Sequence, residues 1–380
     1  MSPDEVMRIA HLTTVHHRHD TRILLKECRS LAKVHDVTLV VADGLGPEIY
    51  DGVRIEDLGK PAGRRERILV KTLEGVRRLI GKFDLLHFHD SELIPAALWA
   101  KARGIKVVYD VHEDLPRDLR IKEWIPSTLR LPLSWSASAA EKIAGRAFDG
   151  VVTATPTIAL RFPVSKTICI RNFPDAAEFQ NVAGKPYHMR PEKFAYIGTL
   201  SHARGIVPLV EAADFTRATL VLGGKFNTPE LESEVRKSRG WQSTEFIGFA
   251  DRKMVADVLA EVRVGVCTLL PTQTHLDSYP VKLFEYLAAG LPVVLSDFPV
   301  WRSLLDGVDC ALFVDPSKPG SIAAAINELM DNPQKAEAMG RKGKEAALSR
   351  FSWVSEEKRL IEFYDGLGSQ TRLNLPPATA

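Results

Sequence analysis

Residues 277–294 read DSYPVKLFEYLAAGLPVV, a helix start that stands directly before an apolar run. Asp277 precedes the predicted helix, Lys282 falls in its first turn, and Glu285 follows eight positions after Asp277. A glycine and a proline then break the helical pattern. A helix joined by so short a turn to a buried strand is typical of parallel α/β proteins, whose ligands bind beyond the carboxyl ends of the strands.

The same alternation of helices and apolar strands runs through the chain of 380 residues. Predicted strands cover 8–14, 37–43, 84–90, 106–113 and 150–155 in the first half, and 193–199, 218–224, 244–249, 262–270, 291–297 and 310–314 in the second half. Predicted helices in the first half cover 20–34, 64–82, 91–103 and 128–147. In the helix at 64–82, one apolar face is formed by Leu69, Leu73, Val76 and Ile80.

The alternation stops once, at a polar and proline-rich stretch, and this break divides the chain into two doubly wound, Rossmann-like α/β domains. A chain of this length is also too long for one ordinary core. The predicted boundaries are 1–172 for the first domain, 173–192 for a linker, 193–350 for the second domain, 351–367 for an amphipathic C-terminal helix and 368–380 for a flexible tail.

The composition indicates a globular protein that works inside the cell. The formal net charge of +2 gives no bulk attraction to nucleic acid, so no nucleic-acid partner is predicted. The four cysteines, Cys28, Cys169, Cys267 and Cys310, show neither paired nor metal-ligand spacing, which favours reduced thiols in a cytoplasmic protein. The sequence shows no signal-peptide pattern, and no apolar run approaches the ~20 residues that span a bilayer.

Polar residues follow the first predicted strand in the loop TTVHHRHDTR, which contains His16, Arg18, Asp20 and Arg22. The histidines of this loop raise the question of a metal site, but their spacing matches no standard zinc pattern and no cysteine supports one. A polar loop that lines a ligand cleft is favoured instead, with Asp20 capping the helix that follows.

Two further predicted strands end in histidines. His87, His89 and Asp90 lie in LLHFHDSE, where His87 is either a cleft residue or a hydrogen-bonded core histidine, and Asp90 is either a ligand contact or a helix cap. His112 follows the strand KVVYDV, where a neutral imidazole can hydrogen-bond a hydroxyl group.

The first strand of the second domain ends in a glycine-containing turn. Gly198 and Thr199 lead to a helix start that carries Arg204, and a helix start presents free N–H groups and a positive dipole end, which suit phosphate. If this turn and the helix start at Lys282 face the same crevice, Arg204 and Lys282 converge on one anion beside the two carboxylates of the opening stretch. Cations for phosphate and acceptors for hydroxyl groups together fit a nucleoside diphosphate sugar.

At these residues the sequence resembles the GT-B glycosyltransferases, in particular the retaining, nucleotide-sugar-dependent family four, over nearly the whole chain. The family has two glutamates eight positions apart followed by Ala-x-Gly-x-Pro-Val, which Asp277, Glu285 and the segment AAGLPV match. His112 matches a family histidine that hydrogen-bonds the donor sugar. The first of the two family glutamates is an aspartate here, one methylene shorter.

The family also carries a Gly-Arg turn followed five residues on by Lys-Gly, whose basic groups grip the diphosphate. Gly198-Thr199 and Arg204-Gly205 stand at these positions, so the first cation is replaced by Thr199. Lys282 lies where the family more often has an apolar residue, and we hypothesise that it restores the lost charge. The HHRHD loop replaces the family's glycine pair, so acceptor chemistry is not carried over.

The resemblance implies a GT-B fold, in which the two Rossmann-like domains face a central cleft and the C-terminal helix crosses back to the first domain. The candidates for binding the donor diphosphate are Gly198, Thr199, Arg204 and Val281, with Lys282 added on the hypothesis of a replaced charge, and the candidates for the ribose and sugar are Glu285, Ser278, Tyr279 and Pro280. The catalytic candidates are His112, Asp277 and Asp20, and the expected acceptor-side residues are His16, Arg18, Arg22 and His89. No metal is expected, because fixed cations hold the diphosphate and no suitable Asp-x-Asp pair is present.

The predicted reaction is transfer of a sugar from a nucleoside diphosphate sugar, a UDP-sugar rather than a GDP-sugar, to a hydroxyl of a glycan or lipid-linked acceptor. The resemblance implies retention of configuration and a place in cell-surface polysaccharide or glycolipid assembly; if the enzyme inverts, Asp20 is the leading base. A nucleotide-sugar epimerase and a catalytically silent nucleotide-sugar-binding subunit stay open as alternatives. A nicotinamide dehydrogenase is disfavoured because the first strand lacks GxGxxG.

The stretch 60–82 is strongly basic, with eight Lys and Arg residues against two Glu residues. It is either the solvated face of a helix that packs on the sheet, or a surface that meets anionic lipid or a lipid-diphosphate acceptor. A second amphipathic stretch with tryptophans, 119–135, favours the membrane interpretation. An anionic membrane surface, at the inner face of the cell membrane, is therefore a further predicted partner.

Overall fold

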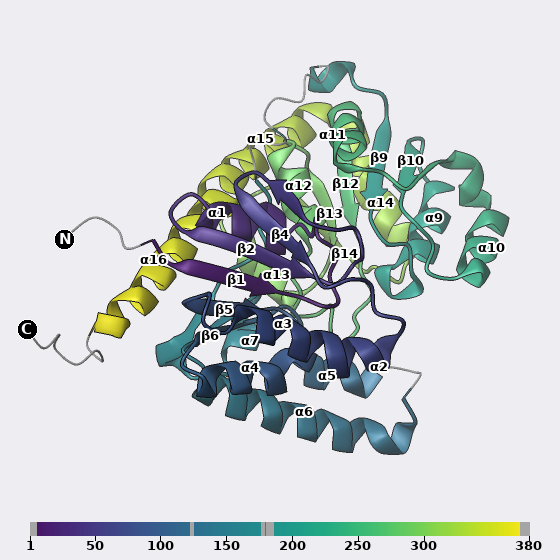
Figure 1. The fold of residues 1–380 in the computed structure, drawn as a ribbon. Helices are drawn as coiled ribbons and strands as arrows, with labels where there is room; N and C mark the ends of the chain where they lie inside the picture. The colour runs from purple at the N-terminus through teal and green to yellow at the C-terminus, as the bar shows by residue number, and fades with distance from the viewer. Residues whose placement is uncertain (1–5, 122–124, 176–178, 180–185, 373–380) are drawn as a thin grey trace, which may run out of the picture. The chain divides into compact units, whose positions relative to one another are not determined.

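The computed structural model describes residues 6–121, 125–175, 179 and 186–372 (Figure 1). The chain forms two compact units, of which unit 1 contains residues 1–172 and 354–380 and unit 2 contains residues 173–353. Residues 176–178 and 180–185 of the expected linker, and residues 373–380 of the expected tail, lie outside the described residues.

Unit 1 is built on an eight-stranded sheet with the strand order β3-β4-β2-β1-β5-β6-β7-β8. Its strands are β1 (Arg8–Leu12), β2 (Asp36–Val41), β3 (Glu48–Tyr50), β4 (Val53–Asp57), β5 (Leu85–Phe88), β6 (Lys106–Val111), β7 (Gly150–Thr153) and β8 (Thr167–Cys169). All neighbouring strands are parallel except β3, which is antiparallel to β4. The five strands predicted in this half are confirmed, and the three that were missed are the outer strands β3, β4 and β8.

Helical segments cover this sheet: η1 (Ile23–Cys28), α1 (Arg29–Leu31), α2 (Arg64–Glu66), η2 (Arg67–Lys71), α3 (Thr72–Leu79), η3 (Ser91–Leu93), α4 (Ile94–Ala102), α5 (Leu115–Ile121), α6 (Ser127–Ala147), α7 (Pro156–Ala159) and η4 (Val164–Lys166). The segment η1 is a π-helix, in which the N–H of Glu27 donates to the carbonyl of Arg22 five residues earlier. Within this short π-helix, the charged side chains of Lys26 and Glu27 are both buried.

The predicted apolar face of 64–82 is only partly covered. Val76 is buried and Gly75 lies against Leu12 so closely that an added Cβ would come within 2.9 Å of a Leu12 methyl carbon. Further back along the segment, Leu69 is 71% exposed and Leu73 is 38% exposed. The unit therefore buries the part of this face around Val76, while Leu69 and part of Leu73 stay exposed to solvent.

The last helix, α16 (Trp353–Arg372), returns the chain to unit 1. Its Tyr364 is fully buried and its hydroxyl is hydrogen-bonded to Nδ1 of His87. Phe363 packs against Gly150, where an added Cβ would meet the phenyl ring at 2.5 Å. The helix continues five residues past its expected end at 367, so the core of unit 1 contains residues from both ends of the sequence.

Unit 2 contains a six-stranded, fully parallel sheet with the order β11-β10-β9-β12-β13-β14. Its strands are β9 (Lys193–Ile197), β10 (Thr219–Gly223), β11 (Thr244–Gly248), β12 (Val264–Cys267), β13 (Val293–Ser296) and β14 (Ala311–Val314). All six strands were predicted from their apolar runs, and the prediction of two Rossmann-like α/β folds is confirmed.

The helices of unit 2 are α9 (Ile206–Ala213), α10 (Pro229–Lys237), α11 (Arg252–Glu261), α12 (Val281–Ala288), α13 (Pro299–Leu304), α14 (Pro319–Asp331) and α15 (Pro333–Arg350), with 3₁₀ turns η5 (Tyr187–Met189), η6 (His202–Arg204) and η7 (Arg239–Ser243). Each sheet reverses its strand order once, between β1 and β5 in unit 1 and between β9 and β12 in unit 2. Ligands of such sheets bind at the carboxyl ends of these central strands.

Candidate active site

Lys282 lies in the first turn of α12, at the carboxyl end of the unit 2 sheet. Its side chain is buried, with Nζ 3.3 Å from the centre of the Tyr196 ring, and Nζ has no hydrogen-bond partner among the residues that the structure describes. Burial lowers the pKa of this ammonium group to about 7. A buried cation held only by an aromatic face is one that an anionic ligand would stabilise.

The turn after β9 leaves room for this lysine. Gly198 has φ +143°, and a Cβ there would lie 2.9 Å from Nζ of Lys282. The next residue, Thr199, uses its carbonyl to accept a hydrogen bond of 3.1 Å from the Tyr196 hydroxyl. The turn and the start of α12 therefore lie side by side, as the anion hypothesis requires.

Arg204 ends the short turn η6 that leads into α9. Its N–H donates to Oγ of Ser201 at 3.3 Å, and Gly205 follows in the left-handed region with φ +69°. A Cβ at Gly205 would lie 2.0 Å from the carbonyl oxygen of Thr268, so the turn is held against the end of β12. Burial is the main cause of the lowered pKa of Lys282, and the charge of Arg204 lowers it further. We call Arg204 and Lys282 the unit 2 cation pair.

Glu285, one turn further along α12, forms an ion pair that the sequence did not reveal. Its Oε1 accepts from Nη1 of Arg252, the first residue of α11, at 2.5 Å. The carboxylate is therefore oriented before any ligand arrives. Its signal in the sequence is weak, because Arg252 lies 33 residues away in another helix.

The loop before α12 carries the remaining sugar-binding candidates. The carbonyl of Ser278 accepts a hydrogen bond of 2.8 Å from Nε1 of the buried Trp301, and Oγ of Ser278 donates to the carbonyl of His275 at 2.9 Å. Tyr279 packs against the hydrophobic core of the unit. Asp277, Pro280 and Val281 are partly exposed around this fixed backbone, so the structure brings them together at the same helix start.

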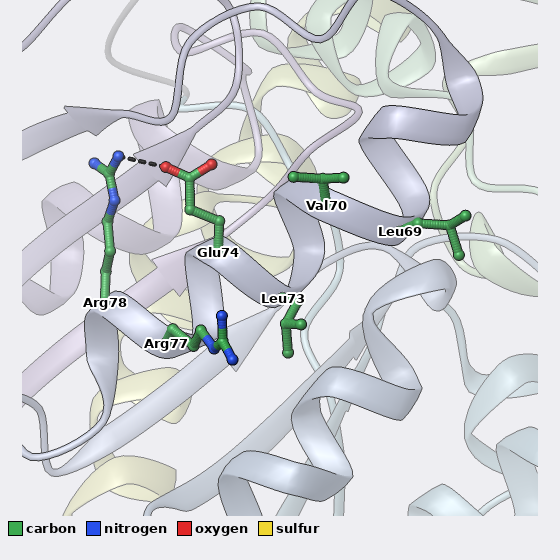
Figure 2. A pocket seen from close by; sticks show the side chains of 6 residues that line it. All are labelled: Leu69, Val70, Leu73, Glu74, Arg77 and Arg78. Atoms are coloured by element: carbon green, nitrogen blue, oxygen red, sulfur yellow. Dashed lines mark hydrogen bonds and ion pairs between the residues drawn. The ribbon is translucent and has the colours of Figure 1, made fainter.

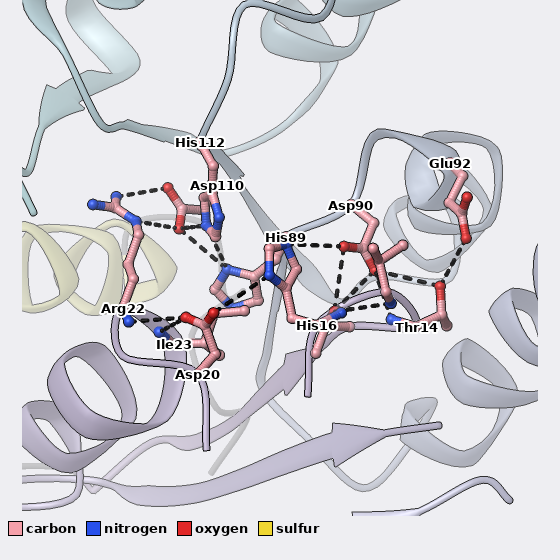
Figure 3. Close-up of polar contacts among 12 residues, drawn as sticks. Thr14, His16, Asp20, Arg22, Ile23, His89, Asp90, Glu92, Asp110 and His112 are labelled. Carbon is pink, nitrogen blue, oxygen red and sulfur yellow. Dashed lines mark hydrogen bonds and ion pairs between the residues drawn. The ribbon is translucent and has the colours of Figure 1, made fainter. Parts of the chain in front are cut away.

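A buried charged network lies at the carboxyl end of β6 in unit 1 (Figure 3). Arg22 donates to both carboxylate oxygens of Asp110, from Nε at 3.0 Å and from Nη2 at 2.8 Å. The same carboxylate lies 2.5 Å from Nε2 of His112 and 3.1 Å from Nδ1 of His89. We call these four residues, Arg22, His89, Asp110 and His112, the unit 1 network.

The charges of this network are matched inside the protein. Burial alone would raise the pKa of Asp110, but Arg22 and His112 hold it well below its usual range. An ionised carboxylate only accepts hydrogen bonds, so Nε2 of His112 donates to Asp110, and in the neutral imidazole Nδ1 carries the lone pair. His112 is thereby oriented to accept a hydrogen bond from a hydroxyl group.

Three of the four expected acceptor-side residues are used by the protein itself. Arg22 and His89 belong to the unit 1 network and are buried. Arg18 donates from Nε to Asp43 at 2.8 Å and from Nη1 to Glu48 at 2.9 Å, which joins its loop to the ends of β2 and β3. Arg18, Arg22 and His89 therefore contact other residues of the protein and hold them in place, whereas the sequence had suggested that they line a ligand cleft.

His16 is the partly exposed member of the acceptor-side set, with 30% of its side chain exposed. Its Nδ1 lies 3.5 Å from Oδ2 of Asp20, and Oδ1 of Asp20 accepts the N–H groups of Arg22 at 2.8 Å and Ile23 at 3.0 Å. Although burial raises the pKa of Asp20, the hydrogen bonds from His16 and Ile23 lower it below its usual range. These contacts agree with the predicted helix cap and make Asp20 a weak base.

The histidine-rich end of β5 resolves two alternatives. His87 is fully buried and hydrogen-bonded to Tyr364, as a core histidine is. Asp90 does not cap the helix after it: its Oδ2 accepts from the N–H of Thr14 at 2.6 Å and from Oγ1 of Thr13 at 3.0 Å. It therefore fixes the loop after β1, because that loop offers unsatisfied N–H groups at its turn.

Each of the two units matches a family of glycosyltransferases. Residues 21–163 match the family described as Glycosyl transferase 4-like domain, and residues 180–346 match Glycosyl transferases group 1. A glycogen synthase of Mycobacterium tuberculosis (strain ATCC 25618 / H37Rv) is 25% identical over 298 residues, which cover 74% of this chain and 68% of that protein.

Two solved structures show the same fold. Sucrose-phosphate synthase from Thermosynechococcus elongatus has a TM-score of 0.78 at 17% identity and covers 96% of this chain and 100% of its own. HepE from Anabaena, in complex with UDP-glucose, has a TM-score of 0.70 at 15% identity, with coverage of 95% and 100%. The predicted GT-B fold is confirmed by this likeness.

Proposed function

This chain belongs to the group 1, family-four-like glycosyltransferases, which use nucleotide sugars, and we propose that it transfers a hexose from a UDP-sugar to a hydroxyl of a glycan or lipid-linked acceptor. The observation that carries the proposal is the unit 2 cation pair: a buried lysine without an anionic partner in the described part of the chain, next to Arg204 and two helix starts. A diphosphate supplies the missing charge.

The cation pair would act mainly in the transition state. As the bond between the sugar and the diphosphate breaks, negative charge accumulates on the leaving group, and Arg204 and Lys282 stabilise it electrostatically. Glu285, oriented by Arg252, would accept hydrogen bonds from the ribose hydroxyls. In this proposal fixed protein cations neutralise the diphosphate.

In unit 2, Asp277 and the backbone from Ser278 to Val281 would offer acceptors and N–H groups to the sugar beside the start of α12. In unit 1, His112 keeps the role that the family resemblance gives it, a hydrogen bond to a sugar hydroxyl. Retention of configuration follows the family pattern. Since Asp20 caps a helix and is a weak base, it is disfavoured as the group that activates the acceptor.

A donor screen tests the proposal. Thermal unfolding is measured with UDP-, GDP- and ADP-sugars, since a ligand at 100 times its dissociation constant adds about 2.7 kcal/mol of stability. Lys282→Ala should weaken donor binding about 10- to 100-fold, because a charge-assisted contact contributes about 1.5–3 kcal/mol. Lys335→Ala, which removes an exposed lysine paired with Glu328 on unit 2, is the matched control and should leave donor affinity unchanged.

Unchanged donor affinity in Lys282→Ala would contradict the role of the cation pair. A product assay then separates the remaining candidates. An altered nucleotide sugar formed without acceptor would identify an epimerase. Donor binding with neither transfer nor donor hydrolysis would identify a catalytically silent subunit.

A lipid-linked acceptor is supported by the surface of unit 1. No helix in the described ranges is long and apolar enough to cross a bilayer. Leu69, Val70 and Leu73 line a surface pocket together with Arg77 and Arg78 (Figure 2), and Leu69 and Val70 are exposed. Exposed apolar residues between basic ones fit an anionic lipid surface.

The first half of the helix α6 adds the exposed apolar side chains of Leu129, Leu131, Leu133 and Trp135. Trp124, also part of the predicted amphipathic stretch, lies outside the described residues. Sedimentation with anionic and neutral liposomes tests this surface, and Leu69→Glu should reduce binding to anionic liposomes. The control is Leu348→Glu on unit 2. Equal binding to both liposome types would remove the anionic lipid from the proposal, and binding to neither would remove the membrane.

A further inference from the structure

Two histidines lie side by side in the centre of the unit 1 sheet. His11 of β1 pairs in register with His87 of β5, and their ring centres are 4.4 Å apart. Glu27, from the π-helix η1, approaches them with Oε2 3.9 Å from Nε2 of His87. All three residues are fully buried. None of them belongs to the sugar-transfer site proposed above.

The hydrogen bonds around His11 define which nitrogen carries its proton. Asp110 accepts from Nδ1 of His89 at 3.1 Å, so Nε2 of His89 carries a lone pair. That lone pair lies 3.0 Å from Nδ1 of His11, which therefore donates. Nε2 of His11 is left as a lone pair, and it has no hydrogen-bond partner within the described ranges.

His87 and Glu27 also have buried side-chain atoms without hydrogen-bond partners in the described part of the chain. Nδ1 of His87 is used by the Tyr364 hydroxyl, and Nε2 of His87 has no hydrogen-bond partner among the described side chains and backbone. Glu27 has Oε1 3.1 Å from Nε of Arg22, but that N–H donates to Asp110. Neither oxygen of Glu27 accepts a hydrogen bond from the described part of the chain.

The spacing of these atoms suits a shared ion. One ligand atom each from His11, Glu27, His87 and His89 lies within 4.8 Å of the others, too far for direct hydrogen bonds at the longest of these separations. Zinc binds nitrogen and oxygen at about 2.0–2.2 Å, which separates two ligands by about 3.4 Å in a tetrahedral site. Burial and the neighbouring Asp110 raise the pKa of Glu27 well above its usual range, so a bound cation would stabilise the ionised form of this carboxylate.

We propose that His11, His87 and Glu27 form a buried site for a divalent metal ion of the zinc class. Two imidazoles and one carboxylate are a ligand set that zinc accepts. His89 and Tyr364 hold the opposite ring nitrogens of the two histidines, as outer partners of metal-binding histidines do. The ion joins β1, β5 and η1, and Tyr364 extends this link to α16.

The site has a structural role and is separate from the HHRHD loop. A chain of hydrogen bonds connects the site to His112: His11 is bonded to His89, His89 to Asp110, and Asp110 to His112. Loss of the ion is therefore expected to loosen the unit 1 network and to lower the stability of unit 1. The metal is not assigned any step in sugar transfer.

Metal analysis of the full chain, purified without an affinity tag, tests the site. After gel filtration in EDTA under native conditions, the chain should retain zinc close to one ion per chain, because the ligands are fully buried. Chain unfolded in EDTA and refolded without metal should melt at a lower temperature, and added Zn²⁺ should restore the melting temperature. Added Co²⁺ should give a visible absorption band, as expected for an ion held by imidazole and carboxylate ligands.

Glu27→Gln should lower the retained zinc about tenfold or more while keeping the shape of the side chain. The matched control is Glu141→Gln, which alters another buried carboxylate of unit 1, one that pairs with Arg161, and should keep its zinc. If Glu27→Gln fails to fold, the refolding of the unaltered chain with and without Zn²⁺ still decides.

Three results would overturn the proposal: unaltered chain without bound metal, a melting temperature insensitive to Zn²⁺, or full zinc retention in Glu27→Gln. In those cases the cluster holds a water molecule or a proton shared between Glu27 and Asp110. The absence of a cobalt absorption band would point the same way.

Discussion

The unit 1 network and the unit 2 cation pair both bury charge at the carboxyl end of a parallel sheet, but they satisfy it differently. Asp110 receives two hydrogen bonds from Arg22 and further contacts from His89 and His112, so its charge is compensated within the protein. Lys282 lies over an aromatic ring, and its Nζ has no hydrogen-bond partner in the described structure. The first arrangement is complete without ligand, whereas the second is completed by one.

This difference separates residues that hold the fold from residues that bind. A satisfied buried pair destabilises the protein when one partner is removed, because the other charge is left alone. A buried charge without a partner costs stability as it stands, and removing it should relieve that cost. The same kind of substitution is therefore expected to have opposite effects in the two units.

The largest expected effect is in unit 1. Asp110→Ala should lower the free energy of unfolding by about 3–5 kcal/mol, since it leaves the Arg22 guanidinium buried without its main partner. Urea unfolding at neutral pH measures the change. Glu232→Gln, which breaks an exposed pair with Arg236, should cost less than about 1 kcal/mol, and equal losses in both variants would remove the contrast.

The opposite sign is expected in unit 2. Lys282→Met should raise the free energy of unfolding by about 1–4 kcal/mol, because a hydrophobic side chain replaces a buried, unpaired charge. The same variant should bind donor more weakly. Lys335→Met, at an exposed position, should change stability by no more than about 0.5 kcal/mol. A clear loss of stability in Lys282→Met would show that the lysine is already compensated in the free protein.

Donor binding should depend on pH through the same lysine. In the free protein the pKa of Lys282 is lowered to about 7, and a bound diphosphate raises it again. Donor affinity should be greatest below pH 7 and should fall above it, by up to about tenfold per pH unit, or about 1.4 kcal/mol. Calorimetry between pH 6 and pH 9 measures this, and Lys282→Met should give a flat profile as its control.

The smallest expected effect concerns the partly exposed pair of Arg252 and Glu285. Arg252→Gln should change the free energy of unfolding by less than about 1 kcal/mol, since solvent screens the pair. Donor affinity should still fall by a few-fold, because the carboxylate of Glu285 loses its fixed orientation. Affinity equal to that of the unaltered chain would show that Arg252 does not orient Glu285.

Most of the fold was predictable because buried parallel strands are nearly continuous apolar runs. Every strand of unit 2 has this pattern, and so do the five inner strands found in unit 1. The outer strands β3 and β4 (EIY and VRIED) are short and carry charges, so their pattern resembles a loop. The exposure of Leu69 was not predictable, because periodicity shows an apolar face but not what covers it.

The candidate site was predictable where chemistry follows a strand directly, and not where it depends on distant partners. Lys282 and His112 were found because they stand at strand or helix ends. Asp110 lies inside a strand, two residues before His112. The only sequence signal that relates the two is that alternate residues of a strand, here the first and third of DVH, lie on the same face. The pairing of Arg22 with Asp110 spans 88 positions of sequence, and no local pattern encodes such a distance.

The return of α16 to unit 1 also affects the order in which the two units can complete their folding during synthesis on the ribosome. Chains emerge from the N-terminus, and domains usually fold in that order. Tyr364 fills the core of unit 1 but is translated after the whole of unit 2. Unit 1, which is synthesised first, therefore keeps part of its core exposed until α16 has been made. Unit 2 can complete its folding before unit 1 does.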